Sequence, residues 1–375
     1  MRLLIAGGLC AVLAGLASAP VRAQEIPRND CDEFGTYRHT GASEITSCLR
    51  QASNTRSLIT VSQAIQRIVG GRLIAGPALA EPAGLLLESD ADIAERLKSS
   101  GTIAVDPAAD VTAAPLVIRK WNVWGDGKYS RIVADDHETT AEGPLVNLTG
   151  GIDYKLTDRV IFGVMGSYEN SDLDTSGLFP ISLQTDGYGG GAYVGITLTS
   201  NVVFSGLVTY SAIDTDLDTG FATSDTDSER LQASGGLTGY WYFGQTRLSP
   251  SFTVAWSKEW QDSFTDSGGG FNPDQTFETV VLTGGDVLGH TFSFDGGMSI
   301  EPFVGTFIDW TVYNNIKTDG FGDFDQPHFA DLRLQTGFNL NIASNVQLAV
   351  TGEVSGLLLD DTNTYAGEAN LAVQF

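Results

Sequence analysis

The sequence predicts an all-β protein, a transmembrane antiparallel β-barrel of about twelve strands that follows a short, partly helical N-terminal region. Three observations predict this fold: the chain begins with an export signal, residues 118–375 alternate apolar and polar side chains with a period of two, and the connections between the alternating segments are short and long in turn. Backbone groups in lipid must be paired within the protein, so strands of this kind need a closed sheet.

The N-terminus has the pattern of a secretory signal peptide over residues 1–23. Arg2 precedes an apolar run (3–16), and the small residues up to Ala23 fit a cleavage site. The apolar run is shorter than the ~20 residues that a membrane-spanning helix needs. We therefore expect export followed by cleavage near Ala23.

Two cysteines remain after cleavage, Cys31 and Cys48, because Cys10 leaves with the signal. A pair of cysteines in an exported chain favours one disulfide that closes a short loop. Two cysteines without histidine partners are too few for a structural zinc site. The four histidines are scattered along the chain, so we expect neither a metal nor a cofactor.

The charge of the chain argues against nucleic-acid binding. Removal of Arg2 and Arg22 with the signal leaves 19 basic and 46 acidic residues, a net charge of −27, whereas phosphates demand a basic face. The acidic run "DTDLDTG" (214–220) fits a calcium loop poorly, because its glycine is one place late and no glutamate closes it. His137 and His290 lack catalytic partners, so we do not expect an enzyme.

The alternation is cleanest in "ADLRLQTGFNLNI" (330–342), where Asp331 and Arg333 lie opposite the apolar face. Segments of this kind begin near residues 120, 144, 159, 187, 202, 229, 247, 277, 299, 327, 346 and 364. Tight turns such as "LTSN" (198–201) and long polar loops separate them alternately, an asymmetry that an outer-membrane barrel has and a soluble β-sandwich does not need. Aromatic residues near strand ends, such as Tyr240–Phe243, are typical of membrane interfaces.

One face of each strand would then meet lipid, and the other would line a polar lumen. Charged residues on the inner face predict a lumen filled with ion pairs and water, although the same charges could hold a linker or select ions. They are Asp153, Lys155, Glu301, Asp309, Asp331, Arg333, Glu353 and Glu368.

The last strand, "TYAGEANLAVQF", places Tyr365, Leu371, Val373 and Phe375 on one apolar face. An assembly machine can take up such a strand by adding it to an exposed sheet edge of its own. We interpret these four residues as a C-terminal membrane-insertion signal. The same strand must later pair with the first strand, so that the barrel has no open edge.

Residues 24–117 precede the barrel and contain two candidate helices. One covers 59–71, and the other covers 89–101, where Ser89 is a cap and Gly101 a stop. Neither candidate reaches the ~20 residues that would span a bilayer. The sequence therefore leaves open whether this region is exposed, cleaved, periplasmic or a pore plug.

Residues 118–375 resemble the translocator barrel of autotransporters, the type V secretion family. The resemblance rests on four segments in order: "KWNVWGDGKYSRI", "LSPSFTVAW", "IEPFVGTFIDW" and "NLAVQF". It implies a twelve-stranded barrel whose lumen carries a helix or linker, joined to an N-terminal passenger that crosses to the surface of a Gram-negative cell. Residues 24–117 show no internal repeat and are too short for several coils of a β-helix passenger.

We therefore expect an outer-membrane protein with a signal peptide (1–23), a short passenger or linker with a possible pore helix (24–117) and a barrel (118–375). It would translocate or display its short N-terminal region. The alternative is a small channel or structural barrel whose N-terminal segment plugs the lumen or stays periplasmic. The expected partners are outer-membrane lipid, lipopolysaccharide, the barrel-assembly machinery and periplasmic chaperones, and we expect a monomer.

Overall fold

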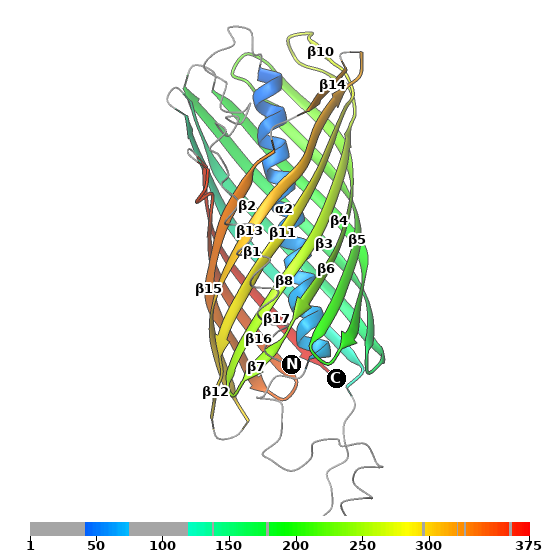
Figure 1. Cartoon of the computed structure of the whole chain (residues 1–375). Helices are drawn as coiled ribbons and strands as arrows, with labels where there is room; N and C mark the ends of the chain where they lie inside the picture. Colours follow the sequence, from blue (N-terminus) through cyan, green and yellow to red (C-terminus); the bar gives the residue numbers. More distant parts are fainter. Residues whose placement is uncertain are drawn as a thin grey trace, which may run out of the picture.

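The computed structural model is a closed antiparallel β-barrel with a helix inside it (Figure 1). It describes residues 42–74, 119–136, 139–177, 180–294, 297–320, 322–325, 328–359 and 362–375. No helix in these ranges is both long and apolar enough to cross a membrane.

Twelve strands form the barrel wall, as the sequence predicts. They are β1 (Trp121–Asp136), β2 (Thr139–Thr157), β3 (Val160–Gly177), β4 (Ile181–Thr199), β5 (Val202–Asp218), β6 (Thr223–Gly239), β8 (Thr246–Gln261), β11 (Gln275–His290), β13 (Ser299–Thr318), β15 (Ala330–Ala343), β16 (Val346–Ser355) and β17 (Thr362–Gln374). Neighbours in this order pair antiparallel, and β17 pairs with β1 to close the barrel. The sheet therefore has no open edge.

In the described part of the chain, five short strands lie at the rims. β7 (Trp241–Phe243) pairs with β8, while β12 (Phe292–Ser293) and β14 (Gly322–Asp325) pair with β13. β9 (Phe264–Thr265) and β10 (Phe271–Asn272) form a separate hairpin in the connection between β8 and β11.

The two ends of the barrel differ. At one end, three of the five connections between wall strands have two residues, such as Ser200 and Asn201 between β4 and β5, and Trp121 pairs there with Phe375. We call this the turn end and the opposite one the loop end. Several strands extend further toward the loop end than predicted: β4 begins at Ile181 and β6 at Thr223. The added residues of β6 are polar, because the ladder continues beyond the part of the wall that lipid can cover.

The outer face of the wall is apolar over a continuous band. Side chains alternate between a buried inner position and an exposed outer one along the strands. The exposed outer residues include Val123, Leu148, Ile152, Phe162, Val164, Val208, Phe252, Val254, Val304, Ile308, Leu334 and Leu371. A band of this kind is the surface that a membrane barrel presents to acyl chains.

The helix α2 (Ala42–Leu73) has 32 residues, or about 48 Å at the usual rise. It includes the helix predicted over 59–71 but begins at Ala42, so the expectation that this candidate is too short to span is wrong. Residues 42–58 are mostly polar and lack the periodic apolar stripe that marks a helix facing an apolar core. Among the described side chains of this part, Arg50, Asn54 and Arg56 have partners among the polar groups of the lumen, which the local sequence does not reveal.

Three expectations fall on residues that the structure leaves out or describes in part. The signal peptide (1–23) and the helix over 89–101 lie outside the described residues. Cys31 also lies outside them, and Cys48 lies in α2 without a described side chain. The disulfide therefore stays a prediction.

Candidate functional site: a helix held in the lumen

α2 runs through the lumen from the loop end to the turn end (Figure 1). Near the loop end, Arg50 Nη2 donates to the hydroxyls of Thr215 and Ser228, at 2.7 and 2.6 Å. Near the turn end, Arg72 Nη2 donates to the carbonyl of Lys120 at 3.1 Å. The helix contacts β3, β4, β5 and β8 most closely and β13, β15, β16 and β17 least, so it lies off centre.

A buried ionic cluster holds the helix near the loop end. Arg50 Nε lies 2.8 Å from Glu259 Oε1, and Arg230 Nε lies 2.9 Å from Glu259 Oε2. Arg230 also pairs with Glu169 at 3.2 Å, and Asn54 of α2 bonds to both Arg230 and Glu259. Because these side chains are almost fully buried, each charge depends on its partners to offset the loss of water.

A second cluster lies within the wall. Arg333 is fully buried; its Nε lies 2.7 Å from Asp309 Oδ2, and its Nη1 lies 3.3 Å from Glu353 Oε2. Lys128 Nζ lies 2.9 Å from Glu353 Oε1, and the guanidinium of Arg333 stacks over the Phe307 ring at 4.5 Å. The cluster ties β13, β15 and β16 to β1, on both sides of the strand that closes the barrel.

Two arginines of α2 reach across the lumen to the strands that the helix contacts least, β13 and β15 to β17. We call this the wide side of the lumen. Arg56 Nη2 lies 3.2 Å from Asp331 Oδ2 on β15, and Arg67 pairs with Glu368 on β17. Both carboxylates are nearly inaccessible to solvent, while Arg67 is partly exposed. Long polar side chains therefore bridge a gap that the helix backbone does not fill.

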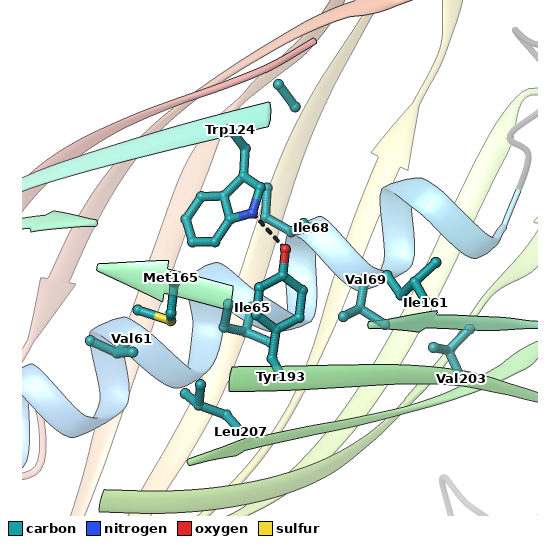
Figure 2. Packing of buried hydrophobic residues seen from close by; sticks show 11 residues of the cluster. Val61, Ile65, Ile68, Val69, Trp124, Ile161, Met165, Tyr193, Val203 and Leu207 are labelled. Carbon is teal, nitrogen blue, oxygen red and sulfur yellow. Dashed lines mark hydrogen bonds between the residues drawn. The ribbon is translucent and has the colours of Figure 1, made fainter. Parts of the chain in front are cut away.

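The last turn of α2 is fixed by a hydrogen-bonded relay. Arg72 Nε lies 3.0 Å from Asp153 Oδ1, and Asp153 Oδ2 accepts from Asn122 at 2.8 Å and from the Tyr193 hydroxyl at 3.0 Å. The Trp124 indole donates to the Tyr193 oxygen at 2.7 Å (Figure 2). One carboxylate thus joins the helix to β1, β2 and β4.

An apolar contact supports this relay on the β3 to β5 side (Figure 2). The helix contributes Val61, Ile65, Ile68 and Val69, and the wall contributes Ile161, Met165, Val203 and Leu207. The rings of Trp124 and Tyr193 lie over glycines of neighbouring strands. A side chain on Gly151 would come within 2.7 Å of the Trp124 ring, and one on Gly163 within 2.6 Å of Tyr193 Cε1.

Substitution of Gly163 by alanine is expected to destabilise the barrel. The new methyl group would overlap the buried Tyr193 ring, whose displacement breaks the bond to Asp153, and overpacking of this kind costs about 1–3 kcal/mol. Urea unfolding followed by tryptophan fluorescence measures the loss.

The matched control is Gly284→Ala, because no atom lies within 4 Å of the methyl group it would add. Its free energy of unfolding should stay within about 0.5 kcal/mol of the wild type. Equal stability of the Gly163→Ala and Gly284→Ala variants would contradict close packing of the Tyr193 ring against Gly163.

Comparison with known proteins identifies the barrel. The profile of the autotransporter β-domain matches residues 123–355, more than half of the chain. The chain belongs to the autotransporter β-domain family. No match was found among the curated proteins.

Solved autotransporter structures share the fold. The translocator domain of the autotransporter NalP from Neisseria meningitidis is 14% identical, with a TM-score of 0.56, over 76% of this chain and 96% of that one. The transport unit of the autotransporter AIDA-I from Escherichia coli is 14% identical, with a TM-score of 0.56, over 71% and 94%. The β-domain of the Bordetella autotransporter BrkA is 14% identical, with a TM-score of 0.54, over 68% and 100%.

The family places this autotransporter among outer-membrane β-barrels whose role is transport. Of the lumenal charges expected from the sequence, Asp153, Glu301, Asp309, Asp331, Arg333, Glu353 and Glu368 lie inside the barrel in ion pairs. Lys155 is also on the inner face, opposite the buried Ile161, but it lies at the rim of the turn end, 3.3 Å from the exposed Asp158. The rim has water to solvate it, so it needs no lumenal partner.

The four residues of the expected insertion signal lie on the outer face of β17 or at its end. Tyr365, Leu371 and Phe375 are exposed, and Val373 is half-buried. Tyr240, which the sequence suggests as an interfacial residue, instead packs against the apolar cluster of the lumen. Its ring occupies the space beside Gly70 of α2.

Sequence reasoning missed the residues that hold the helix. These are Arg50, Arg56, Arg67 and Arg72 of α2, with Glu169, Arg230 and Glu259 of the wall. One signal in the sequence could have indicated them, namely the local enrichment of arginine. The chain has only 21 Lys and Arg residues, and four of them are arginines within the 32 residues of α2. A helix enriched in arginine, in a chain so acidic, indicates an acidic surface around it.

Space remains between the helix and the strands that it contacts least. A cavity of about 200 Å³ opens at the turn end, and one of about 110 Å³ adjoins it; both are lined by Arg67, Tyr240, Arg247 and Asn339. Within the described ranges, no group of three His, Cys, Asp or Glu side chains is placed to hold a metal ion. The polar groups that line the cavities suit water.

Proposed function

We propose that this autotransporter displays the short segment that precedes Ala42 at the cell surface, with α2 closing the pore behind it. The observation that supports this is the direction of the helix: its N-terminal half bonds to the loop end and its last turn to the turn end. Outer-membrane barrels carry long loops outside the cell and short turns in the periplasm. The chain before Ala42 would therefore leave the barrel on the outside.

The displayed part is then shorter than the region 24–117 that the sequence suggested as passenger or linker. The segment 75–118 starts after Ile74 and ends before Arg119, and both of these residues lie at the turn end. A segment that begins and ends there needs no passage through the pore. We therefore propose residues 24–41 as the displayed segment and a periplasmic position for residues 75–118.

Protease treatment of intact cells tests this topology. An epitope tag inserted after Pro27 is expected to be removed by the protease while the barrel remains intact, because the tag would lie outside the membrane. Immunoblotting against the tag and against the barrel measures the two parts separately.

Two tags on opposite sides of the membrane calibrate the experiment. A tag at Gly220 at the loop end should be removed from intact cells, and a tag at Gly297 at the turn end should be removed only after permeabilisation. If the tag after Pro27 behaves like the one at Gly297, the N-terminal segment is periplasmic. The alternative of a channel or structural barrel plugged by α2 would then replace surface display.

We further propose the partners that the fold needs on its way to the membrane. Before the barrel closes, β17 has an unpaired edge that the barrel-assembly machinery could take up, with Tyr365, Leu371, Val373 and Phe375 on its outer face. Periplasmic chaperones would cover the same apolar band beforehand. In the finished monomer, lipid and lipopolysaccharide would cover the band, whose exposed side chains support this assignment.

A further inference from the structure

Two phenylalanines are exposed in the loops of the loop end. Phe221 lies in the connection between β5 and β6 and is 87% exposed, and Phe271 begins β10 and is 70% exposed. The two loops touch, because Ser267 N donates to Thr223 O and Thr223 N donates to Ser267 Oγ, both at 2.8 Å. We call Phe221 and Phe271 with these two loops the aromatic tip.

The aromatic tip is ordered by its own hydrogen bonds. Asp266 closes the β9–β10 hairpin by accepting from Gly270 N at 2.8 Å through its side chain and donating to Gly270 O at 2.9 Å through its backbone. At the base of the hairpin, the Asp274 carboxylate accepts from Ser263 N at 2.6 Å. A partner that binds an ordered tip loses less conformational entropy than one that must order the loops first.

Lipid does not account for the exposure of these rings. Along the outer face of β5, Val208 and Tyr210 are followed by Asp214, Asp216 and Asp218. Because carboxylates do not lie in hydrocarbon, the lipid-facing band ends near Tyr210. The strand from there to Asp218 rises roughly 20 Å at the usual tilt, so the aromatic tip stands well above the acyl chains.

The surroundings of the tip are acidic. Residues 212–229 and 262–275 contain no Lys or Arg. Several acids face like charges across the ladder, since Asp214 lies opposite both Asp186 and Asp227, an arrangement that is unfavourable until a cation approaches. The acidic residues of the two segments are Asp214, Asp216, Asp218, Asp225, Asp227, Glu229, Asp262, Asp266 and Asp274.

We propose that the aromatic tip is a docking surface for a protein that presents lysine or arginine side chains around an exposed apolar group. The apolar group would cover Phe221 and Phe271, and the basic side chains would face the aspartates of β5 and β6. Charge complementarity selects this partner over the phosphate groups of lipopolysaccharide, which the same aspartates repel unless divalent cations intervene. The inference goes beyond surface display and does not depend on it.

Binding of a synthetic peptide to the full-length protein in lipid nanodiscs tests the proposal. The probe is a peptide of about twelve lysine and leucine residues, compared with a lysine–serine peptide of equal charge and a glutamate–leucine peptide of equal apolar content. We expect the lysine–leucine peptide to bind more tightly than both. The double substitution Phe221→Ser with Phe271→Ser should weaken its binding about 30-fold, because exposed aromatic anchors carry much of an interface's affinity.

The matched control replaces two exposed phenylalanines at the opposite end, Phe292→Ser with Phe294→Ser, and should leave the peptide's dissociation constant unchanged. The pair Asp216→Asn with Asp225→Asn, directly opposite across β5 and β6, should reduce the salt dependence of binding. Both aspartates are solvent-exposed, so folding is expected to be retained.

Four outcomes would overturn the proposal. One is failure of the lysine–leucine peptide to bind the wild type, and another is equal binding by the wild type and the Phe221→Ser, Phe271→Ser variant. The third is binding of the lysine–serine peptide as tight as that of the lysine–leucine peptide, which would show that the surface attracts positive charge without recognising an apolar group. If lipopolysaccharide vesicles with Mg²⁺ bind in a way that requires both phenylalanines, the surface recognises lipid and not protein.

Discussion

Replacement of Arg50 and Arg72 by glutamine is expected to turn the closed barrel into an open pore. Arg50 pairs with Glu259 near the loop end, and Arg72 pairs with Asp153 near the turn end. With the helix in place, the substitutions leave each of the two buried carboxylates without its arginine. Once the helix leaves the lumen, water hydrates both carboxylates, so the substitutions destabilise only the closed state. Breaking one buried pair costs about 3–5 kcal/mol, and the two sites lie far enough apart for their costs to add.

The shift should be large enough to see in single pores. A change of about 5.5 kcal/mol moves a two-state equilibrium from 99:1 to 1:99, so the double variant should spend much of its time without the helix in the lumen. Planar-bilayer recordings are expected to show a conductance that the wild type shows only rarely.

The open pore should prefer cations. The arginines of α2 offset an excess of negative charge on the wall while the helix is present. A reversal potential measured across a KCl gradient should therefore shift toward the potassium equilibrium potential once the helix leaves. Within the described residues, the inward-facing acids are Asp126, Asp153, Glu169, Glu259, Glu301, Asp309, Asp331, Glu353 and Glu368, and the inward-facing bases of the wall are Lys128, Arg230, Arg247 and Arg333.

The control for this experiment replaces two exposed arginines, one on the outer surface and one in a turn, Arg131→Gln with Arg159→Gln. Exposed ion pairs contribute only about 0–1 kcal/mol, so these substitutions should leave the pore closed. A closed pore in the Arg50→Gln, Arg72→Gln variant would show that apolar packing on β3 to β5 alone retains the helix. An open pore in the control variant would remove the lumenal ion pairs as the explanation.

Replacement of Arg333 by methionine is expected to destabilise the barrel itself. Arg333 compensates Asp309 and Glu353 within the wall, and its methionine variant leaves Asp309 with the Thr283 hydroxyl at 2.7 Å but without this cation. Because the side chains of the site are buried, the loss should be about 3–5 kcal/mol. Urea unfolding in lipid vesicles measures it.

A second substitution separates charge from shape. Asp309→Asn in the Arg333→Met background removes the uncompensated charge and should recover part of the lost stability, so the two changes should be non-additive. Arg131→Met at the exposed pair with Glu142 serves as the control and should cost at most about 1 kcal/mol. Additive effects of the Arg333 and Asp309 substitutions would contradict a direct ion pair.

Much of the wall could be predicted from the sequence, because successive residues of a strand point to opposite faces of the sheet, and their polarity shows which face is apolar. The alternation in 330–342 puts Asp331 and Arg333 on the inner face, where the structure has them. The same rule puts Lys155 on the inner face, opposite Ile161, but a strand's parity does not tell where the lumen ends, and Lys155 lies at the rim. Strand ends at the loop end were also misjudged, since the polar first residues of β6 carry no lipid-facing pattern.

The helix could be predicted only in part, for a different reason. The stretch 59–71 shows an apolar side at Ile65, Ile68 and Val69, which packs on β3 to β5. The preceding turns carry Arg50, Asn54 and Arg56, and nothing in their spacing indicates a helix buried in a protein. A polar helix becomes stable there because the lumen supplies a partner for each of these groups.

The sequence by itself therefore determined the class of fold, the approximate number of strands and the inward face of strands with clean alternation, such as 330–342. These properties follow from a period of two, which is read within a few residues. Only the tertiary structure decided that α2 fills the pore, in which direction it runs and which arginine meets which carboxylate. Arg50 and Glu259, or Arg67 and Glu368, are far apart in the chain and meet only when the closed barrel brings all its inner faces around one axis.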